Sequence, residues 1–231
     1  MGKEKTAFNR SRYATAADRY RRRIDWSDRI LYRMCMGPPC HSDLGRVHGK
    51  LSLLGRSYAT GLERLLKGNK EQSGNLNAWT AYFVRRAKAL DGIVQEVRRV
   101  RSPLTEDKLE RIAVLHGRFA SALQKHPRLR KAKKRKDKLS PTSFVSKYLH
   151  FHNPVVPIYD SWSSAGACHH HLLGKGSDTL GAMPIGTDPD YWHFLRGFWC
   201  VYQDARKEFG RKTSVRHLDR YLLAVRKKKR Q

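Results

Sequence analysis

Apolar residues recur every three or four positions along most of the chain, which is the spacing of one face of an α-helix. No stretch alternates apolar and polar residues in the way that a half-buried strand does. The pattern therefore predicts an all-α fold built from amphipathic helices. These helices are expected over residues 24–36, 43–66, 77–97, 105–125, 141–153, 188–210 and 214–225. In the first of them the expected core residues are Ile24, Trp26, Ile30, Leu31 and Met34.

Proline and capping signals indicate several helix boundaries. Pro141 suits the first turn of a helix, because that turn leaves its backbone donor unused anyway. Pro154 and Pro157 end the same helix and stiffen the connector that follows. Asp188, directly before a proline, is a predicted N-cap of the next long helix, and Gly210 is its predicted end.

The chain is long enough for one sizeable helical domain. Residues 1–23 carry many arginines and few apolar side chains, so we expect a basic, flexible arm there. Residues 24–231 are expected to form the helical domain, with room for two lobes, roughly 24–126 and 127–231, around a central cleft.

Positive charge dominates the composition, with 48 Lys and Arg against 20 Asp and Glu and a formal net charge of +28. Such an excess is typical of a protein whose partner is a polyanion, since phosphates neutralise it. Nucleic acid is therefore the favoured partner. The densest basic run is a candidate for contacts with the phosphate backbone, through Arg128, Arg130, Lys131, Lys133, Lys134, Arg135, Lys136 and Lys138.

No run of about 18 apolar residues is present, so no membrane partner is expected. The first residues, Met-Gly-Lys-Glu-Lys, lack the apolar run of a secretory signal. We therefore expect a monomeric protein of the cytoplasm, associated with the nucleoid.

Four cysteines are too few and too irregularly spaced for a disulfide scaffold in a chain of this length. Cys35, Cys40 and His41, together with the Cys168–His171 cluster, have side chains of the type that bind zinc. Their spacing fits no compact zinc finger, and buried thiols with a surface histidine loop explain them equally well. We expect no metal and no cofactor.

Lys147 is the main candidate for chemistry. Phe144, Tyr148 and Phe151 share one helical face, and Lys147 lies next to this aromatic stripe. Desolvation there would lower the pKa of its amine towards values at which the amine is a nucleophile. Asp160 follows the stiff connector, where its carboxylate can cap a following helix or turn back to Lys147. A snorkelling lysine with an ordinary N-cap aspartate is the alternative.

The segments Ser146-Lys147-Tyr-Leu-His-Phe151 and Val-Pro157-Ile-Tyr-Asp160 resemble the helix-hairpin-helix DNA glycosylases, most closely the archaeal 8-oxoguanine DNA glycosylase branch. A second segment, Ser214 to Leu223, resembles the last helix of that branch. The resemblance implies a compact multi-helix glycosylase fold and a DNA glycosylase with possible AP lyase activity on an oxidised or otherwise modified base.

The same resemblance implies roles for individual residues. Lys147 would be the nucleophile, and Asp160 its electrostatic or general-base partner. Phe151 would stack on the extruded base and Asp219 would line the base pocket. Trp162, in the loop after Asp160, is a further candidate for substrate contact.

Two alternatives remain open. The protein could be a non-catalytic DNA- or RNA-binding protein on a glycosylase-like scaffold, which is favoured by Leu223 standing where the branch has a pocket tryptophan. A tyrosine recombinase is suggested by His217-x-x-Arg220, a pattern short enough to recur by chance.

Overall fold

The computed structural model describes residues 8–22, 26–38, 41–58, 72–126, 129, 140–160, 163–164, 167 and 180–227. Within these ranges every regular element is helical and no strand occurs, which confirms the predicted all-α class. The elements are α1 (Arg10–Arg22), α2 (Trp26–Met36), α3 (Leu44–Tyr58), α5 (Gln72–Arg85), α6 (Ala87–Arg98), α7 (Glu106–Gln124), α9 (Thr142–His152), α11 (Pro189–Phe209), the 3₁₀ turn η1 (Gly210–Lys212) and α12 (Val215–Lys227).

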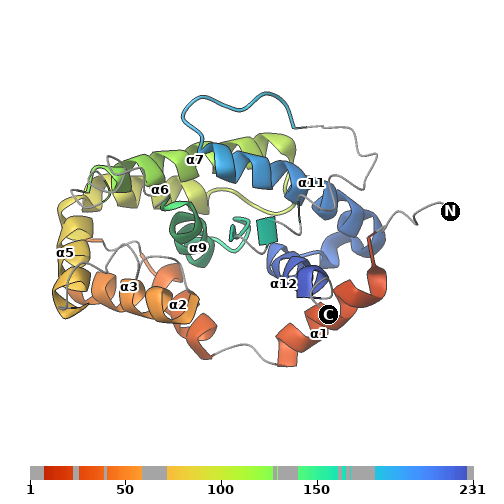
Figure 1. Ribbon diagram of the computed structural model, residues 1–231, viewed down its shortest axis with the longest axis horizontal. Coiled ribbons are helices and arrows are strands. Elements are labelled where there is room, and N and C mark those ends of the chain that lie inside the picture. Colours follow the sequence, from red (N-terminus) through yellow and green to blue (C-terminus); the bar gives the residue numbers. More distant parts are fainter. Residues whose placement is uncertain are drawn as a thin grey trace.

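Helix α9 is the centre of the fold. It packs against α2, α6 and α7, and Figure 1 shows it between the α6–α7 pair and α2. Every residue from Phe144 to His152 is buried, including the lysine and two histidines. A helix that is covered on all sides cannot be amphipathic, so each of its polar side chains needs a partner inside the protein.

Two buried histidines, His150 on α9 and His116 on α7, are hydrogen-bonded as neutral rings. His150 Nδ1 donates to the Val156 carbonyl at 2.8 Å, and its Nε2 accepts from the Tyr32 hydroxyl at 2.6 Å. His116 Nε2 donates to the Thr142 carbonyl at 3.1 Å. Each neutral ring therefore holds a backbone carbonyl around α9 in place.

These rings make the stability of the protein depend on pH. Burial lowers the pKa of His116 to about 4 and that of His150 to about 3, from an ordinary value of 6.5. Below pH 6.5 the unfolded chain binds protons that the folded protein excludes, so the free energy of unfolding falls by about 3 kcal/mol per pH unit for the pair, down to about pH 4.

Urea unfolding between pH 7 and pH 4.5 measures this slope. Replacing His150 by glutamine, which keeps one donor and one acceptor, should reduce the slope by about 1.4 kcal/mol per pH unit. An unchanged slope in H150Q would contradict the assignment of His150 as a buried neutral ring.

Most predicted helices are present, but the segment 77–97 forms two helices rather than one. Helix α5 ends at Arg85 and α6 begins at Ala87, because Arg86 departs from helical geometry with φ −107° and ψ 10°. The Arg86 N–H bonds the Phe83 carbonyl at 3.0 Å, which tightens the last turn of α5. The apolar spacing continues across this break, so the pattern alone does not reveal it.

Residues 10–22 form the helix α1, which differs from the flexible arm predicted for residues 1–23. The helix is held on the fold by Tyr13, one of the tyrosines between the arginines. Tyr13 is buried against α12 and its ring stacks on Phe209 at 4.6 Å between centroids. Its hydroxyl also accepts the Ser214 N–H at 3.4 Å.

None of the described helices is long and apolar enough to cross a membrane.

The buried face of α2 also differs from the predicted one. Trp26, expected in the core, is 71% exposed, whereas Asp28 is fully buried. The helix is rotated relative to the expectation because Asp28 pairs with an arginine of α12. An ion pair formed across the fold thus overrides the apolar pattern of this helix.

Candidate lysine–aspartate site

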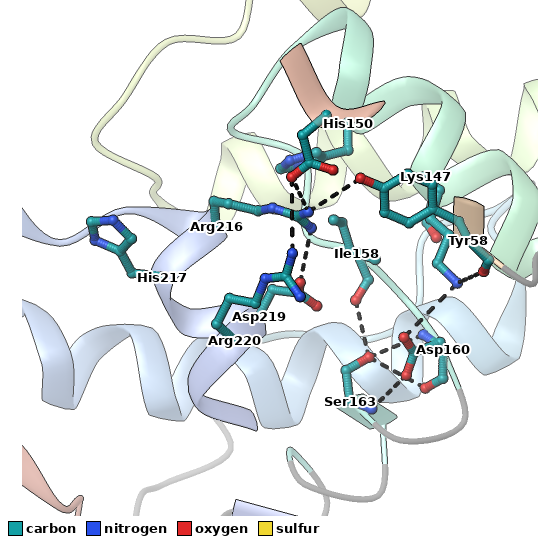
Figure 2. Close-up of polar contacts among 12 residues, drawn as sticks. Tyr58, Lys147, His150, Ile158, Asp160, Ser163, Arg216, His217, Asp219 and Arg220 are labelled. Carbon is teal, nitrogen blue, oxygen red and sulfur yellow. Dashed lines mark hydrogen bonds and ion pairs between the residues drawn. The ribbon is translucent and has the colours of Figure 1, made fainter. Parts of the chain in front are cut away.

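Lys147 projects from α9 into a small group of oxygen atoms (Figure 2). Its Nζ lies 3.8 Å from Asp160 Oδ2 and donates to the Tyr58 carbonyl at 3.1 Å and to Ser143 Oγ at 3.2 Å. The Lys147 side chain is only 6% exposed, and that of Asp160 is 22% exposed. The structure therefore brings together the two residues that the sequence analysis paired.

The position of Asp160 is fixed by a hydrogen bond to its carboxylate and by contacts of the connector that precedes it. One carboxylate oxygen, Oδ1, accepts the Ser163 N–H at 2.7 Å, while Oδ2 faces Lys147. The preceding residue is tied to α9, because the Tyr159 N–H donates to Ser146 Oγ at 3.0 Å. Tyr191 fixes the connector from the other side by donating to the Pro157 carbonyl at 2.8 Å. Asp160 thus caps a turn and faces the amine at the same time.

The electrostatic environment of Lys147 favours a neutral amine more than bulk water does. Burial lowers the pKa of Lys147 below its ordinary value. The carboxylates of Asp160 and Asp219 oppose this shift, and the Arg216 guanidinium adds to it. Burial is the largest of these effects, so the amine loses its proton more readily than an exposed lysine.

A buried cluster of charges adjoins this site and joins α12 to α2. Arg216 donates to Asp28 Oδ2 at 2.6 Å and to Asp219 Oδ2 at 3.0 Å. Burial disfavours its charge, but Asp219 and Asp28 outweigh that effect and raise the pKa of Arg216. Arg216 also lies 3.4 Å from the Tyr58 hydroxyl and packs over the Tyr58 ring. Arg216 therefore helps to position Tyr58, whose backbone carbonyl accepts the hydrogen bond from Lys147.

Asp219 has one carboxylate oxygen engaged and one available. Its Oδ2 accepts from Arg216, whereas its buried Oδ1 bonds no group among the described residues. Burial raises the pKa of Asp219; Arg216 opposes the shift and the negative charge of Asp160 adds to it. Asp219 is thus a partly paired acid that belongs electrostatically to the same site as Lys147.

Phe151 is fully buried rather than exposed as a platform. Its ring packs against Tyr32 at 4.8 Å and Tyr58 at 5.2 Å between centroids. It also borders a narrow gap in the core that is too small to hold a water molecule, together with Leu31, Cys35, Lys50, Leu54 and Tyr148. Stacking of Phe151 on an extruded base stays a prediction, and Tyr58 covers the ring in this conformation.

Several predicted functional residues lie outside the described part of the chain. These are Trp162, the zinc candidates Cys40 and Cys168–His171, and the basic residues Arg128, Arg130, Lys131, Lys133, Lys134, Arg135, Lys136 and Lys138. Among the described residues no group of three or more His, Cys, Asp or Glu side chains could hold a metal ion. Burial raises the pKa of the Cys35 thiol to about 12, so this thiol stays protonated.

The recombinase-like pair does not form a site of its own. Arg220 lies 3.9 Å from Asp28 and belongs to the buried charge cluster. His217, from the same helix, points away from that cluster in Figure 2. The two residues therefore face different surroundings.

No pattern in the sequence singled out Asp28, Arg216 or Tyr58 as residues of this site. Asp28 lies in the first turn of α2, where an acidic residue commonly stabilises the helix dipole. In the sequence, Arg216 is indistinguishable from the many arginines expected at the surface. The signal that could have raised attention is the i,i+3 spacing of Arg216 and Asp219 on an otherwise apolar helix face. Their partner Asp28 is 188 positions away from Arg216, a separation that a single sequence does not reveal.

Comparison with protein-family models, with characterised proteins and with solved structures gives no match to this chain.

Proposed function

We propose that the protein is a lysine-dependent DNA glycosylase with AP lyase activity. The observation that carries the proposal is the buried amine of Lys147 at 3.8 Å from the carboxylate of Asp160. A lysine that is desolvated and faces one acid is the arrangement needed for an amine nucleophile whose proton must be removed. The net charge of +28 supports a polyanionic substrate, which we take to be double-stranded DNA.

The reaction begins when a modified base is extruded from the duplex. Neutral Lys147 attacks the sugar C1′, the N–C1′ bond forms, and the bond from C1′ to the base breaks with its electron pair leaving on the base. Asp160 stabilises the positive charge that develops on the sugar and accepts the proton that the attacking amine loses. The C1′–O4′ bond then breaks, O4′ takes the proton from Asp160, and the opened sugar is left as a Schiff base with Lys147. Loss of a C2′ proton expels the 3′ phosphate and cleaves the strand.

Substrate recognition is assigned to the groups around the amine. Asp219 Oδ1, buried and without a bond among the described residues, is available to a base edge. Phe151 stacks on the base after Tyr58, which covers its ring, has moved aside. The substrate is an oxidised or otherwise modified base.

The proposal includes the architecture of the helix-hairpin-helix glycosylases, with lobes of roughly residues 24–126 and 127–231 around a cleft. The basic run from Arg128 to Lys138 grips the DNA backbone before α9, and the protein acts as a monomer in the cytoplasm at the nucleoid. The support for this part is the resemblance of the α9 and α12 segments, together with the central place of α9 in an all-helical fold.

Borohydride trapping tests the proposal. The protein is incubated with a panel of duplexes that carry an abasic site, oxidised purines, oxidised pyrimidines or methylated bases, and borohydride reduces any Schiff base to a stable bond. A covalent protein–DNA band is expected with the abasic duplex and with at least one modified base. If no duplex gives such a band while a known AP lyase does, the enzymatic proposal is wrong.

The second candidate is a non-catalytic DNA- or RNA-binding protein. Two observations favour it: Phe151 is covered, and the Lys147 amine already has two hydrogen-bond acceptors. In that case duplexes or RNA bind with the salt dependence of phosphate contacts, and no covalent band forms with any substrate.

A further inference from the structure

Helix α2 has two faces with different tasks. Its buried face contributes Asp28 to the charge cluster and Tyr32 to the packing against Phe151. Its outer face carries Trp26, Arg29, Arg33 and Met36, which are spaced three, four and three residues apart. This spacing places all four side chains in one stripe along the helix, and all four are exposed.

The composition of this α2 stripe is unusual for a surface with only a solubilising role. Trp26 is 71% exposed and Met36 is 62% exposed. Within the part of the chain that the structure describes, neither Arg29 nor Arg33 forms an ion pair with a carboxylate. The stripe thus offers one large flat ring and two cations one helical turn apart, with no counter-charge among the described residues.

We propose that the α2 stripe binds DNA, with Arg29 and Arg33 on successive phosphates and the Trp26 ring stacked on an unpaired base. Arginine forms strong charge-assisted bonds with phosphate, and an aromatic face stacks on any base that has lost its neighbours. The net charge of +28 supplies the electrostatic complementarity. The proposal rests on the proposed function only in that DNA is the partner.

The stripe lies on the face of α2 opposite to the one that contacts the buried charge cluster. Asp28 lies between Trp26 and Arg29 in the sequence and bonds Arg216 on the opposite face. A helix with its side chains is about 10 Å across. DNA held on the stripe therefore lies about one helix width from the Arg216–Asp219 pair. Extrusion of a base leaves an opened stack in the duplex, which is the structure that Trp26 recognises.

The test measures binding without chemistry, in the K147Q background. Two DNA probes are used: a fully paired duplex, and the same duplex with one unpaired, bulged nucleotide. The variants are W26A, W26F and the double variant R29Q/R33Q. The control is K207Q/R211Q, which removes the same charge from exposed positions on α11 and the turn after it.

Trp26→Ala is expected to weaken binding of the bulged duplex by about 5- to 150-fold and to leave the paired duplex unchanged, since only an unstacked base can use the ring. Trp26→Phe, which keeps an aromatic ring, should bind the bulged duplex with most of the parent's affinity. R29Q/R33Q should weaken both probes and reduce the slope of log K against log salt by about 1.8, which corresponds to two phosphates. K207Q/R211Q should change this slope much less.

Three results would overturn the proposal. Equal binding of the bulged duplex by W26A and the parent removes the stacking role. An unchanged salt slope in R29Q/R33Q, or one that falls equally in the control, removes the phosphate contacts. Loss of binding to phosphatidylserine vesicles in R29Q/R33Q, with DNA affinity retained, assigns the stripe to a lipid surface. Because the lysine is absent from every protein tested, failure of the glycosylase proposal does not affect the outcome.

Discussion

Replacing Lys147 by glutamine is expected to abolish covalent trapping on an abasic or modified duplex and to lower the excision rate by at least about 1,000-fold. Glutamine is one atom shorter than lysine and still donates hydrogen bonds, but its amide nitrogen has no nucleophilic electron pair. The measurement is the yield of borohydride-stable adduct, together with single-turnover excision of the base. Affinity for an unmodified duplex should change little, because the Lys147 side chain is only 6% exposed.

A matched control separates this lysine from the many others. Lys108 is a half-buried lysine at the surface. Its Nζ also donates to a backbone carbonyl, that of Pro103, at 2.7 Å. K108Q removes the same charge and the same type of bond, and its trapping yield should equal that of the parent. Trapping that persists in K147Q, or that is lost equally in K108Q, would show that Lys147 is not the nucleophile.

Replacing Arg216 by methionine should lower the free energy of unfolding by about 3 to 5 kcal/mol, the cost of leaving buried charges without their partner. Asp28 is fully buried and Asp219 nearly so, and both accept from this one guanidinium. Methionine fills most of the volume, so the loss reports mainly the uncompensated carboxylates. Urea unfolding at pH 7, followed by circular dichroism, measures the change.

The surface ion pair of Arg118 and Glu96 provides the comparison. Its distance, 3.0 Å, equals that of the Arg216–Asp219 pair, but the Arg118 side chain is 50% exposed. R118M should therefore cost less than about 1 kcal/mol, because water already solvates both partners. If R216M and R118M lower stability by similar amounts, the cluster at Arg216 does not hold the fold together.

The sequence predicted best what depends on neighbouring residues. Helix α7 begins after Thr105, whose side chain accepts the Lys108 N–H, and α11 begins after Asp188, whose Oδ1 accepts the Asp190 N–H at 3.0 Å. Both boundaries follow from local capping. Lys147 and Asp160 also lie close in sequence, and a stiff connector with few conformations joins them. Their approach could therefore be predicted without knowledge of the rest of the fold.

The parts that could not be predicted depend on contacts between distant segments. The apolar pattern of α2 favoured a buried Trp26, but the pairing of Asp28 with Arg216 turns that helix and leaves the indole in solvent. The apolar stripe of α9 indicated a half-exposed helix, whereas all of its residues from Phe144 to His152 are buried and it packs against α2, α6 and α7. Hydrophobic spacing gives a preferred face, and a charge pair across the fold can outweigh it.

The cluster around Lys147 draws on residues from Asp28 near one end of the chain to Asp219 near the other. Contacts of such high sequence separation form late, after the local helices. In a nascent or partly folded chain Lys147 is hydrated, and its pKa falls only when the complete tertiary structure buries the amine. Under the proposed function, this order of assembly delays the nucleophile until the groups that surround it are in place.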